Sequence, residues 1–453
     1  MRWTISLEGG PKRVNHAACA IKDKIYSFGG YCSGEVRSNT APVDVHVLNT
    51  RTYRWTRVFG DQPFSKKTKM DRAQDSAENS FSSGFDSDAE ADVEFEIENE
   101  LMEDEPMDDQ DEIDQQWIYN PLHGAQEMNM EMSPVEEERF RNVPYMRYGH
   151  TVVAYNNKCF LWGGRSDSQG ASQRLYEFDP ESNTWSSIEV EGFIPPARDG
   201  HSAVVYGSLM IVFGGFEEEN QRFSQETYAF DFSTHKWTEL KCSGTLPQHR
   251  DFHAATMLGD KMYVFGGRSD ERGQFHSSID YYDNAMHVLD LKTLAWSTPK
   301  VTNSPLGRRS NTLWSFTGKV YMFGGFESQN NKHFADLHCF NPQDNSWVQL
   351  KPAGSTCPVP RRRQCSVMVG TKLFLFGGTK PHETKRNSLV DLGDLHILDY
   401  ENTLFSICVE SVVRTGLYRR FNALIPECIQ EDIENSITPN ILSRVSRTSN
   451  SSG

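Results

Sequence analysis

The sequence lacks the features that mark membrane-spanning and secreted proteins. No apolar run approaches the ~18 residues that a membrane helix needs, and the first residues, MRWTISLEGG, contain no basic region followed by an apolar stretch. The nine cysteines are an odd number without a C-x-x-C pair, which argues against a disulfide framework and a zinc ribbon. We therefore expect a protein with reduced thiols in the cytoplasm or the nucleus, and no membrane partner.

The negative charge is concentrated in one segment. The chain has 46 Lys and Arg against 62 Asp and Glu, a net charge of −16. Residues 71–140 hold 24 acidic and 2 basic residues, a net charge of −22 for that window, so the −16 of the chain leaves +6 for everything else. Residues 61–140 combine Ser, Asp and Glu with few aromatic residues, and we expect them to form a disordered acidic insertion.

A repeat of about 52 residues organises the rest of the chain. Gly-Gly follows a run of β-branched and aromatic residues six times, at Gly29-Gly30, Gly163-Gly164, Gly214-Gly215, Gly266-Gly267, Gly324-Gly325 and Gly377-Gly378. Most periods begin with a Pro/Arg-rich entry, R-x-x-H in four of them, and reach a Trp that opens a fourth strand. This pattern resembles the kelch repeat and predicts an all-β fold, a six-bladed kelch β-propeller.

The two ends of the repeat region predict how the propeller closes. The last unit has no Trp strand after LHILD, whereas the start of the chain, WTISLEGGP, parallels the Trp strand of an inner unit. We expect the N-terminal strand to complete the last blade, which leaves no free sheet edge. The predicted parts are the closing strand and first blade (1–60), the acidic insertion (61–140), blades two to six (141–400), a short C-terminal helical segment (401–435) and a flexible tail (436–453).

Most residues of the repeat are interpreted as structural. We expect blade-to-blade salt bridges from the entry arginines, Arg13, Arg147, Arg198, Arg250, Arg308 and Arg362. The strand histidines recur once per blade, so they cannot converge on a metal ion. No convergent acid, base or metal-ligating set is recognisable, and we expect no catalytic residues, no metal and no cofactor.

The periodicity changes after residue 401. Apolar residues at four-residue spacing predict two helical faces, Leu404, Cys408 and Val412 in the first segment and Ile425, Ile429 and Ile433 in the second. Thr403 is a suitable N-cap of the first helix, Thr415-Gly416 a suitable stop, and Pro426 a suitable start of the second. Two short helices that pack on the propeller edge would account for this pattern, and so would a pair of partner-binding motifs.

The chain as a whole resembles the kelch domain-containing protein 3 family, which are kelch-repeat substrate receptors of cullin-2 ubiquitin ligases. The resemblance rests on MRWTISLEGGPKRVNHAA, YSFGGYCSGE, PYMRYGH, RDFHAATMLGDKMYVFGGR and PRRRQC, and it extends through the C-terminal segment. It implies a non-enzymatic substrate-recognition subunit that binds C-terminal, glycine-end degrons in the propeller pocket and so promotes ubiquitination and degradation. The acidic insertion departs from the family pattern.

The resemblance also implies partners for the helical segment. Leu404, Cys408 and Val412 resemble the BC box that binds elongin C, in which Leu enters a pocket and the small Cys lets the helices approach. Ile425, Pro426 and Ile429 resemble the cullin-2 box. The implied partners are therefore elongin B/elongin C, cullin-2 and substrate proteins with C-terminal degrons.

Binding a terminal carboxylate in a buried pocket calls for preorganised cations, and arginine supplies them best. The resemblance implies that the degron carboxylate is bound by Arg268, Arg272, Arg309 and Ser310. It places four further residues in the pocket lining, Arg165, Phe216, Arg363 and Gln364. Phe216 stands where a related receptor has Tyr, so a hydrogen bond through that hydroxyl is lost.

Two further hypotheses come from the sequence. A chromatin-associated kelch interaction module is favoured by the +6 body and by the cluster Arg361-Arg362-Arg363, whereas the acidic insertion would compete with DNA for that cluster, so we expect no direct nucleic-acid binding. The terminal Ser451-Ser452-Gly453 is itself a glycine end, and the tail is hypothesised to bind its own or a sister molecule's pocket.

Overall fold

The computed structural model describes residues 1–33, 35, 41–59, 141–277, 279–354, 356–385 and 388–442. The chain divides into two units, Met1–Gly60 with Met132–Gly453 and, separately, Asp61–Glu131. The predicted insertion (61–140) and the terminal Gly453 lie outside the described residues, so the hypotheses about them stay predictions. None of the described helices is long and apolar enough to cross a membrane.

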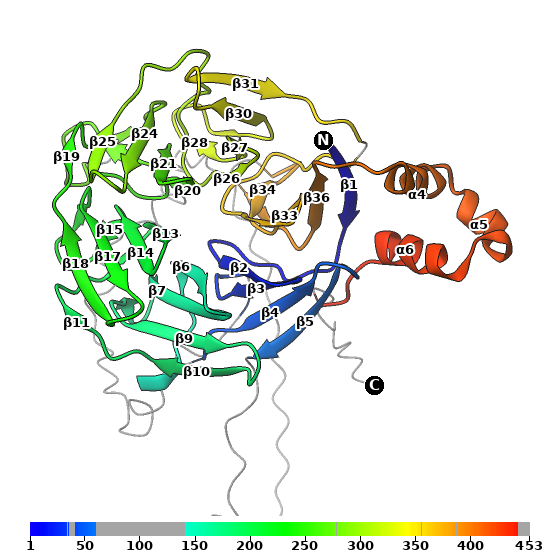
Figure 1. Ribbon diagram of the computed structural model, residues 1–453, viewed down its shortest axis with the longest axis horizontal. Coiled ribbons are helices and arrows are strands. Elements are labelled where there is room, and N and C mark those ends of the chain that lie inside the picture. The colour runs from blue at the N-terminus through cyan, green and yellow to red at the C-terminus, as the bar shows by residue number, and fades with distance from the viewer. Residues whose placement is uncertain are drawn as a thin grey trace, which may run out of the picture. The chain divides into compact units, whose positions relative to one another are not determined.

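Six sheets of at least four strands make up most of the described part of the chain (Figure 1). The first sheet contains β2 (Ala17–Ile21), β3 (Lys24–Phe28), β4 (Val45–Asn49) and β5 (Arg54–Phe59). The second contains β6 (Tyr148–Tyr155), β7 (Lys158–Ser166), β9 (Leu175–Asp179) and β10 (Thr184–Ser187), with β8 (Gly170–Ala171) paired to β7. The third contains β13 (Ser202–Tyr206), β14 (Leu209–Phe213), β17 (Thr227–Asp231), β18 (Lys236–Leu240) and β11 (Glu191–Gly192).

The other three sheets repeat this order. The fourth contains β20 (Ala254–Leu258), β21 (Lys261–Phe265), β24 (Met286–Asp290), β25 (Ala295–Ser297) and β19 (Ser243–Gly244). The fifth contains β26 (Thr312–Phe316), β27 (Lys319–Phe323), β30 (Leu337–Asn341) and β31 (Ser346–Leu350). The sixth contains β32 (Cys365–Val369), β33 (Lys372–Phe376), β36 (Leu395–Asp399) and β1 (Arg2–Leu7), and β1 pairs antiparallel with β36.

Short strands flank the Gly-Gly turns: all but the first lie between a Gly-Gly turn and the third strand of its sheet, and the first precedes β13. They are β12 (Arg198–Asp199), β15 (Phe216–Glu217), β16 (Arg222–Phe223), β22 (Ser269–Asp270), β23 (Asp280–Tyr281), β28 (Phe326–Glu327), β29 (Lys332–His333), β34 (Thr379–Pro381) and β35 (Leu389–Asp391). The nearly all-β architecture predicted from the sequence is confirmed.

The hydrophobic core lies between the sheets rather than at one centre. Six clusters of buried side chains each combine residues of two sheets, first with second, second with third and so on, and the last combines sixth with first. Because each sheet is covered on both faces, second strands such as LMIVF in β14 read as continuous apolar runs instead of alternating ones. The tryptophans that open the outer strands are buried in these clusters.

The innermost strands β2, β6, β13, β20, β26 and β32 contact one another in sequence, and β32 contacts β2. Just before each of them, one backbone N–H donates to the carbonyl of the equivalent residue in the neighbouring sheet, at 2.7 to 3.3 Å. These six hydrogen bonds form a closed circle, which we call the collar, of Asn15, Gly149, Gly200, Phe252, Ser310 and Arg363. All six have a positive φ, from 47 to 67°, so four side-chain-bearing residues are held in a conformation that favours glycine.

The C-terminal segment is helical and starts where the sequence predicted. α4 (Leu404–Thr415) has Thr403 as N-cap, whose side chain accepts from the Ser406 N–H, and Gly416 as C-cap with φ 69°. α5 (Leu417–Phe421), the 3-10 turn η1 (Asn422–Leu424) and α6 (Glu427–Ile437) follow, and Pro426 precedes α6. Figure 1 shows these helices projecting from the ring beside β1.

The end of α6 is fixed to both ends of the ring. Asn440 is buried, its N–H donates to the Glu8 carbonyl, and its side chain accepts from the Trp55 N–H and donates to the Tyr53 carbonyl. Arg54 donates to two carbonyls near the end of α6. Residues 434–440, which we call the C-terminal anchor, therefore connect the start of β5, the edge strand of the first sheet, to the residue after β1.

Candidate functional site

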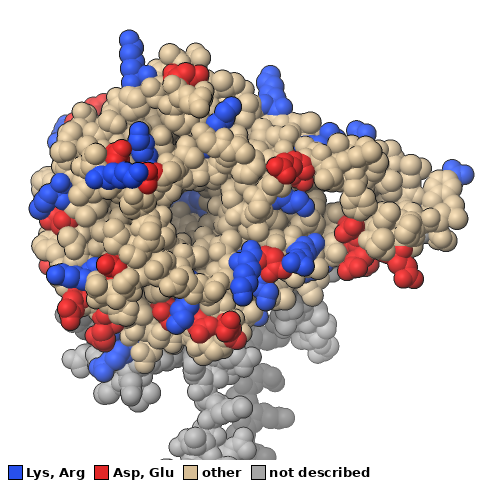
Figure 2. All heavy atoms as spheres, viewed as in Figure 1, with Lys and Arg blue, Asp and Glu red and all other residues tan. Residues whose placement is uncertain are grey.

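The collar surrounds a central hollow, and Figure 2 shows basic side-chain atoms inside it. Next to the collar, the residue after each entry arginine pairs with the residue after the Gly-Gly of the same sheet. We call these the rim pairs: Val14–Tyr31, Tyr148–Arg165, Asp199–Phe216, Asp251–Arg268, Arg309–Phe326 and Arg362–Thr379. Glycine is needed beside them because a Cβ on Gly267, for example, would lie 2.7 Å from the Asp251 carbonyl oxygen.

The entry arginines are structural, but the prediction about their partners needs two corrections. Among the described residues, each donates to a carbonyl or carboxylate of its own sheet and not across blades, such as Arg198 to Glu217 and Arg250 to Asp283, because the entry segment runs back along the Gly-Gly loop. In the sixth sheet the equivalent residue is Arg361, which donates to Asp394 and to the Gly377 carbonyl. Arg362 instead belongs to a rim pair.

Arg268 is held by a buried carboxylate. Its Nε and Nη2 donate to the two oxygens of Asp251 at 3.1 and 2.6 Å, and its guanidinium lies over the Phe223 ring, 5.2 Å from the centroid. Burial lowers the pKa of Arg268, but the charge of Asp251 and its hydrogen bonds outweigh this and raise it. The pair fixes the guanidinium, and Nη1 makes no hydrogen bond among the described residues.

Arg309 is the least satisfied of the predicted carboxylate-binding residues. It is 4% exposed, yet its guanidinium makes no hydrogen bond within the described part of the chain. Its nearest carboxylate oxygen belongs to Asp280 at 3.9 Å, and it lies 5.4 Å from the centre of the Phe326 ring. Ser310 follows it in the collar, and Arg362 lies over the same Phe326 ring at 4.0 Å.

The rim carboxyl group of Asp199, unlike that of Asp251, has no charge partner in hydrogen-bonding range among the described residues. Asp199 is buried, and burial raises its pKa to about 7, although Arg165 lowers it; Asp251 raises it further. Arg165 is the rim cation nearest to it in the second sheet, and its own ion pair is with Glu218 at 3.7 Å. The rim therefore carries both signs of charge, with acids in the third and fourth sheets.

The other predicted residues fall into different environments. Arg272 is exposed on the loop after β22, and Phe216 is a buried rim residue. Arg363 is a collar residue whose Nη1 donates to the Tyr31 hydroxyl at 2.7 Å. Gln364 donates to the carbonyl of Phe323 in the preceding sheet. His150, the histidine of R-x-x-H in the second sheet, makes the equivalent contact with the Phe28 carbonyl, so Gln364 takes the place of that histidine in the sixth sheet.

Sequence reasoning missed the rim residues Arg362, Asp199 and Asp251 and the ring of Phe223. One signal was available for Arg362, because each entry arginine stands 16 residues before the first Gly of its Gly-Gly, which selects Arg361. No local signal marks Phe223, because it reaches Arg268 from the neighbouring sheet. Among the described residues, no three His, Cys, Asp or Glu side chains lie together so that they could hold a metal ion.

The predicted partner-binding residues of the helical segment are accessible. On α4, Leu404 is 78% exposed, Cys408 is exposed and Val412 is half-buried, and no residue of this helix is buried. Beyond it, Ile425 and Ile429 are half-buried and Pro426 is exposed. Packing on the propeller edge, the alternative interpretation, holds for the C-terminal anchor but leaves the apolar face of α4 uncovered.

Comparisons with known proteins agree with this architecture. The KLHDC2/KLHL20/DRC7 Kelch-repeats domain matches residues 149–378, and a Kelch motif matches residues 12–59. Kelch domain-containing protein 3 of Bos taurus and of Homo sapiens are each 38% identical over 99% of this chain and 98% of their own length. Host cell factor 2 of Homo sapiens is 31% identical over 53% of this chain and 31% of its own length.

The solved structure of YjhT aligns with a TM-score of 0.52 at 13% identity, over 86% of this chain and 96% of that one, which shows the fold alone. Kelch repeats are typically non-enzymatic, and they make this chain a protein-interaction module. The chain belongs to the kelch-repeat proteins and, within them, to the Kelch domain-containing protein 3 family.

Proposed function

We propose that this chain is the substrate-recognition subunit of a cullin-2 ubiquitin ligase and binds C-terminal, glycine-end degrons at the rim of the central hollow. Binding there promotes ubiquitination and degradation of the substrate, in the cytoplasm or the nucleus. The observation that carries the proposal is Arg309, a buried guanidinium at the rim that makes no hydrogen bond among the described residues.

A terminal carboxylate fits this cation chemically. A buried charge without hydrogen bonds is costly, and a carboxylate is the acceptor that a guanidinium binds in two parallel hydrogen bonds. Arg268 is close by in the neighbouring sheet, and its Nη1 is not used by Asp251. A terminal glycine carries no side chain beside its carboxylate, so the rim needs no pocket for one.

The ligase part of the proposal is supported by the helical segment. Leu404, Phe405 and Ile407 are exposed on α4, and Leu424 is 80% exposed before α6. An amphipathic helix with an uncovered apolar face is typical of helices that dock in a partner's groove. We propose that Leu404, Cys408 and Val412 bind elongin C and that Ile425, Pro426 and Ile429 bind cullin-2.

The degron part is tested with two fluorescent peptides of one sequence that end in glycine, one a free acid and one amidated. We expect the wild-type protein to bind the free acid at least tenfold more tightly. Arg309→Gln should lower the affinity for the free-acid peptide by more than tenfold, since one charge-assisted hydrogen bond contributes about 1.5 to 3 kcal/mol. Arg51→Gln is the matched control, because its side chain is 80% exposed on the surface. Equal affinity of the wild type for both peptides would contradict the proposal.

The ligase part is tested separately by co-purification. Leu404→Asp should lose elongin C, elongin B and cullin-2 from the purified complex, because a carboxylate replaces the side chain that enters the partner's pocket. The same variant should keep the wild-type affinity for the free-acid peptide. Retention of all three partners by Leu404→Asp would contradict the proposal that α4 binds elongin C. It would not affect the proposed degron site.

A further inference from the structure

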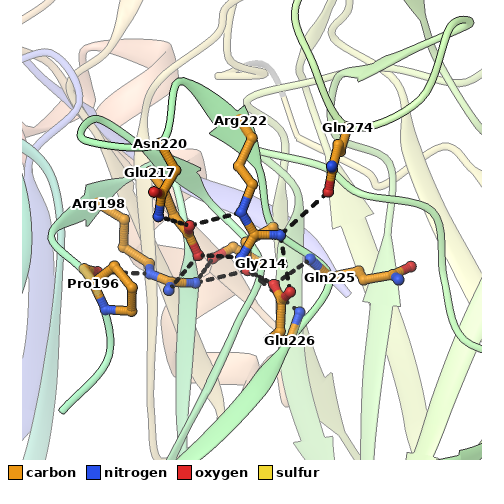
Figure 3. A network of polar contacts seen from close by, with 10 residues as sticks. Pro196, Arg198, Gly214, Glu217, Asn220, Arg222, Gln225, Glu226 and Gln274 are labelled. Atoms are coloured by element: carbon orange, nitrogen blue, oxygen red, sulfur yellow. Dashed lines mark hydrogen bonds and ion pairs between the residues drawn. The ribbon is translucent and has the colours of Figure 1, made fainter.

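A network of charged side chains in the third sheet lies beside the rim (Figure 3). Glu217 is fully buried and accepts from two arginines, from Arg198 Nη2 at 2.8 Å and from Arg222 Nε at 2.9 Å. Arg222 also donates to Glu226 at 2.9 Å and to Gln274, a residue of the fourth sheet's loop, at 3.4 Å. The network thus joins the β15–β16 hairpin to the neighbouring sheet.

This network fixes the position of one aromatic ring. Phe223 is adjacent to Arg222 on β16 and pairs with Phe216 on β15, while its N–H donates to the Gln274 carbonyl at 2.7 Å. Its side chain is fully buried, with the Phe216 ring at 5.4 Å and edge-on. Phe223 is therefore held from its own hairpin and from the fourth sheet at once.

The ring of Phe223 and the carboxylate of Asp251 hold Arg268 in complementary directions. Asp251 binds the guanidinium through Nε and Nη2, whereas the Cζ of Arg268 lies over the ring of Phe223, 5.2 Å from its centroid. The cation–π contact and the bidentate pairing together restrict the rotations that a long arginine side chain otherwise keeps. The edge that carries Nη1 is left to receive an incoming carboxylate.

The fifth sheet has a hairpin of the same design. In β28–β29, Phe326 pairs with His333 and Glu327 with Lys332, where the third sheet has Phe216 with Phe223 and Glu217 with Arg222. Here the ring that faces rim arginines is Phe326, with Arg309 and Arg362 over it. Each hairpin thus supplies one aromatic ring to the arginines of the rim.

We propose that Phe223 is a specificity-determining residue of the carboxylate site, and that Glu217 and Arg222 are positioning residues that hold its ring under Arg268. The assignment rests on the proposed function, because it concerns how that site receives a carboxylate. Residues of the third sheet thus hold an arginine of a site whose arginines come from the fourth and fifth sheets.

The test measures the affinity of the free-acid and amidated glycine-end peptides for variants in the full chain. Phe223→Leu keeps the apolar volume but removes the aromatic face, and we expect about a three- to tenfold loss of free-acid affinity with the amide affinity unchanged. Phe334→Leu is the matched control, since Phe334 lies under the structural Arg308 at 3.6 Å. This control should change the urea unfolding midpoint without changing the preference for the free acid.

Three further variants separate positioning from packing alone. Arg222→Ala should weaken free-acid binding about threefold or more, and Arg222→Lys should restore it, because the fifth sheet has Lys332 at the equivalent place. In an Arg268→Ala background, Phe223→Leu should have no additional effect on free-acid affinity, since the residue it positions is gone.

The outcomes distinguish this assignment from the proposed function. Wild-type protein that binds acid and amide equally overturns both. A wild type that prefers the acid, with the same preference in Phe223→Leu, overturns the assignment of Phe223 alone. If Phe223→Leu does not fold, Arg222→Ala decides, and unchanged free-acid affinity of that variant overturns the assignment.

Discussion

Replacing Asp199 with asparagine should change how the stability of the protein depends on pH. Asp199 is buried at the rim, and the charged groups that face it are Arg165, Asp251, Arg268 and Glu218. Burial disfavours its ionised form and raises its pKa from 3.8 to about 7. The folded protein therefore keeps this proton over a pH range in which the unfolded chain has lost it.

The sign and size of the effect follow from this difference in pKa. Well below pH 3.8 both states are protonated and the carboxyl group does not affect stability. As the pH rises toward 7, the unfolded state gains an ionisation that the folded state resists, so stability falls. One pKa unit corresponds to about 1.4 kcal/mol, which gives a penalty of about 2 kcal/mol at pH 5 and about 4 kcal/mol at pH 8. Asparagine cannot ionise, so Asp199→Asn removes the penalty.

The assay is urea unfolding of wild type and Asp199→Asn at pH 5, 6, 7 and 8. The difference between their unfolding free energies should grow in favour of the variant by roughly 2 to 3 kcal/mol between pH 5 and pH 8. The buried histidines titrate in both proteins and cancel from this difference. A difference that stays constant with pH would refute the reasoning, because it would mean that Asp199 does not titrate in this range in the folded protein.

Three further predictions concern stability, and urea unfolding checks each. Burial lowers the pKa of His150 to about 3, so His150 is neutral in the folded protein and the stability should fall as the pH drops below 6.5. The variant His150→Gln, which has the residue found at the equivalent position of the sixth sheet, should lose about 2 kcal/mol less stability than the wild type at pH 5. Equal losses in the two proteins would contradict this prediction. Asn440→Ala removes two hydrogen bonds of the C-terminal anchor and should cost about 2 to 4 kcal/mol, whereas the control Glu431→Ala, at an exposed position of α6 outside the anchor, should change stability by about 0.5 kcal/mol or less. Arg361→Met leaves the buried Asp394 without its arginine and should cost about 3 to 5 kcal/mol, and a near-neutral result would show that Arg361 is not the structural entry residue.

Local patterns of the sequence determined the repeat, the strands and the helical segment. Apolar runs that end in Gly-Gly, entry arginines and opening tryptophans each specify backbone conformation and burial over a few residues, so their spacing was enough to predict the kelch fold. The same holds for α4, where Thr403 and Gly416 cap the helix through hydrogen bonds to residues at most a turn away. Because these signals act over short distances in the chain, they can be read without tertiary information.

The arrangement of the candidate site was decided only by the tertiary structure. Asp251 and Arg268 meet because two segments of one sheet return to the collar, and Phe223 reaches Arg268 from another sheet altogether. Asn440 is bound by residues more than 380 positions earlier in the chain. Contacts of this kind depend on how the sheets pack around the hollow. The spacing of residues in the sequence does not specify which side chain of another sheet will contact a buried charge.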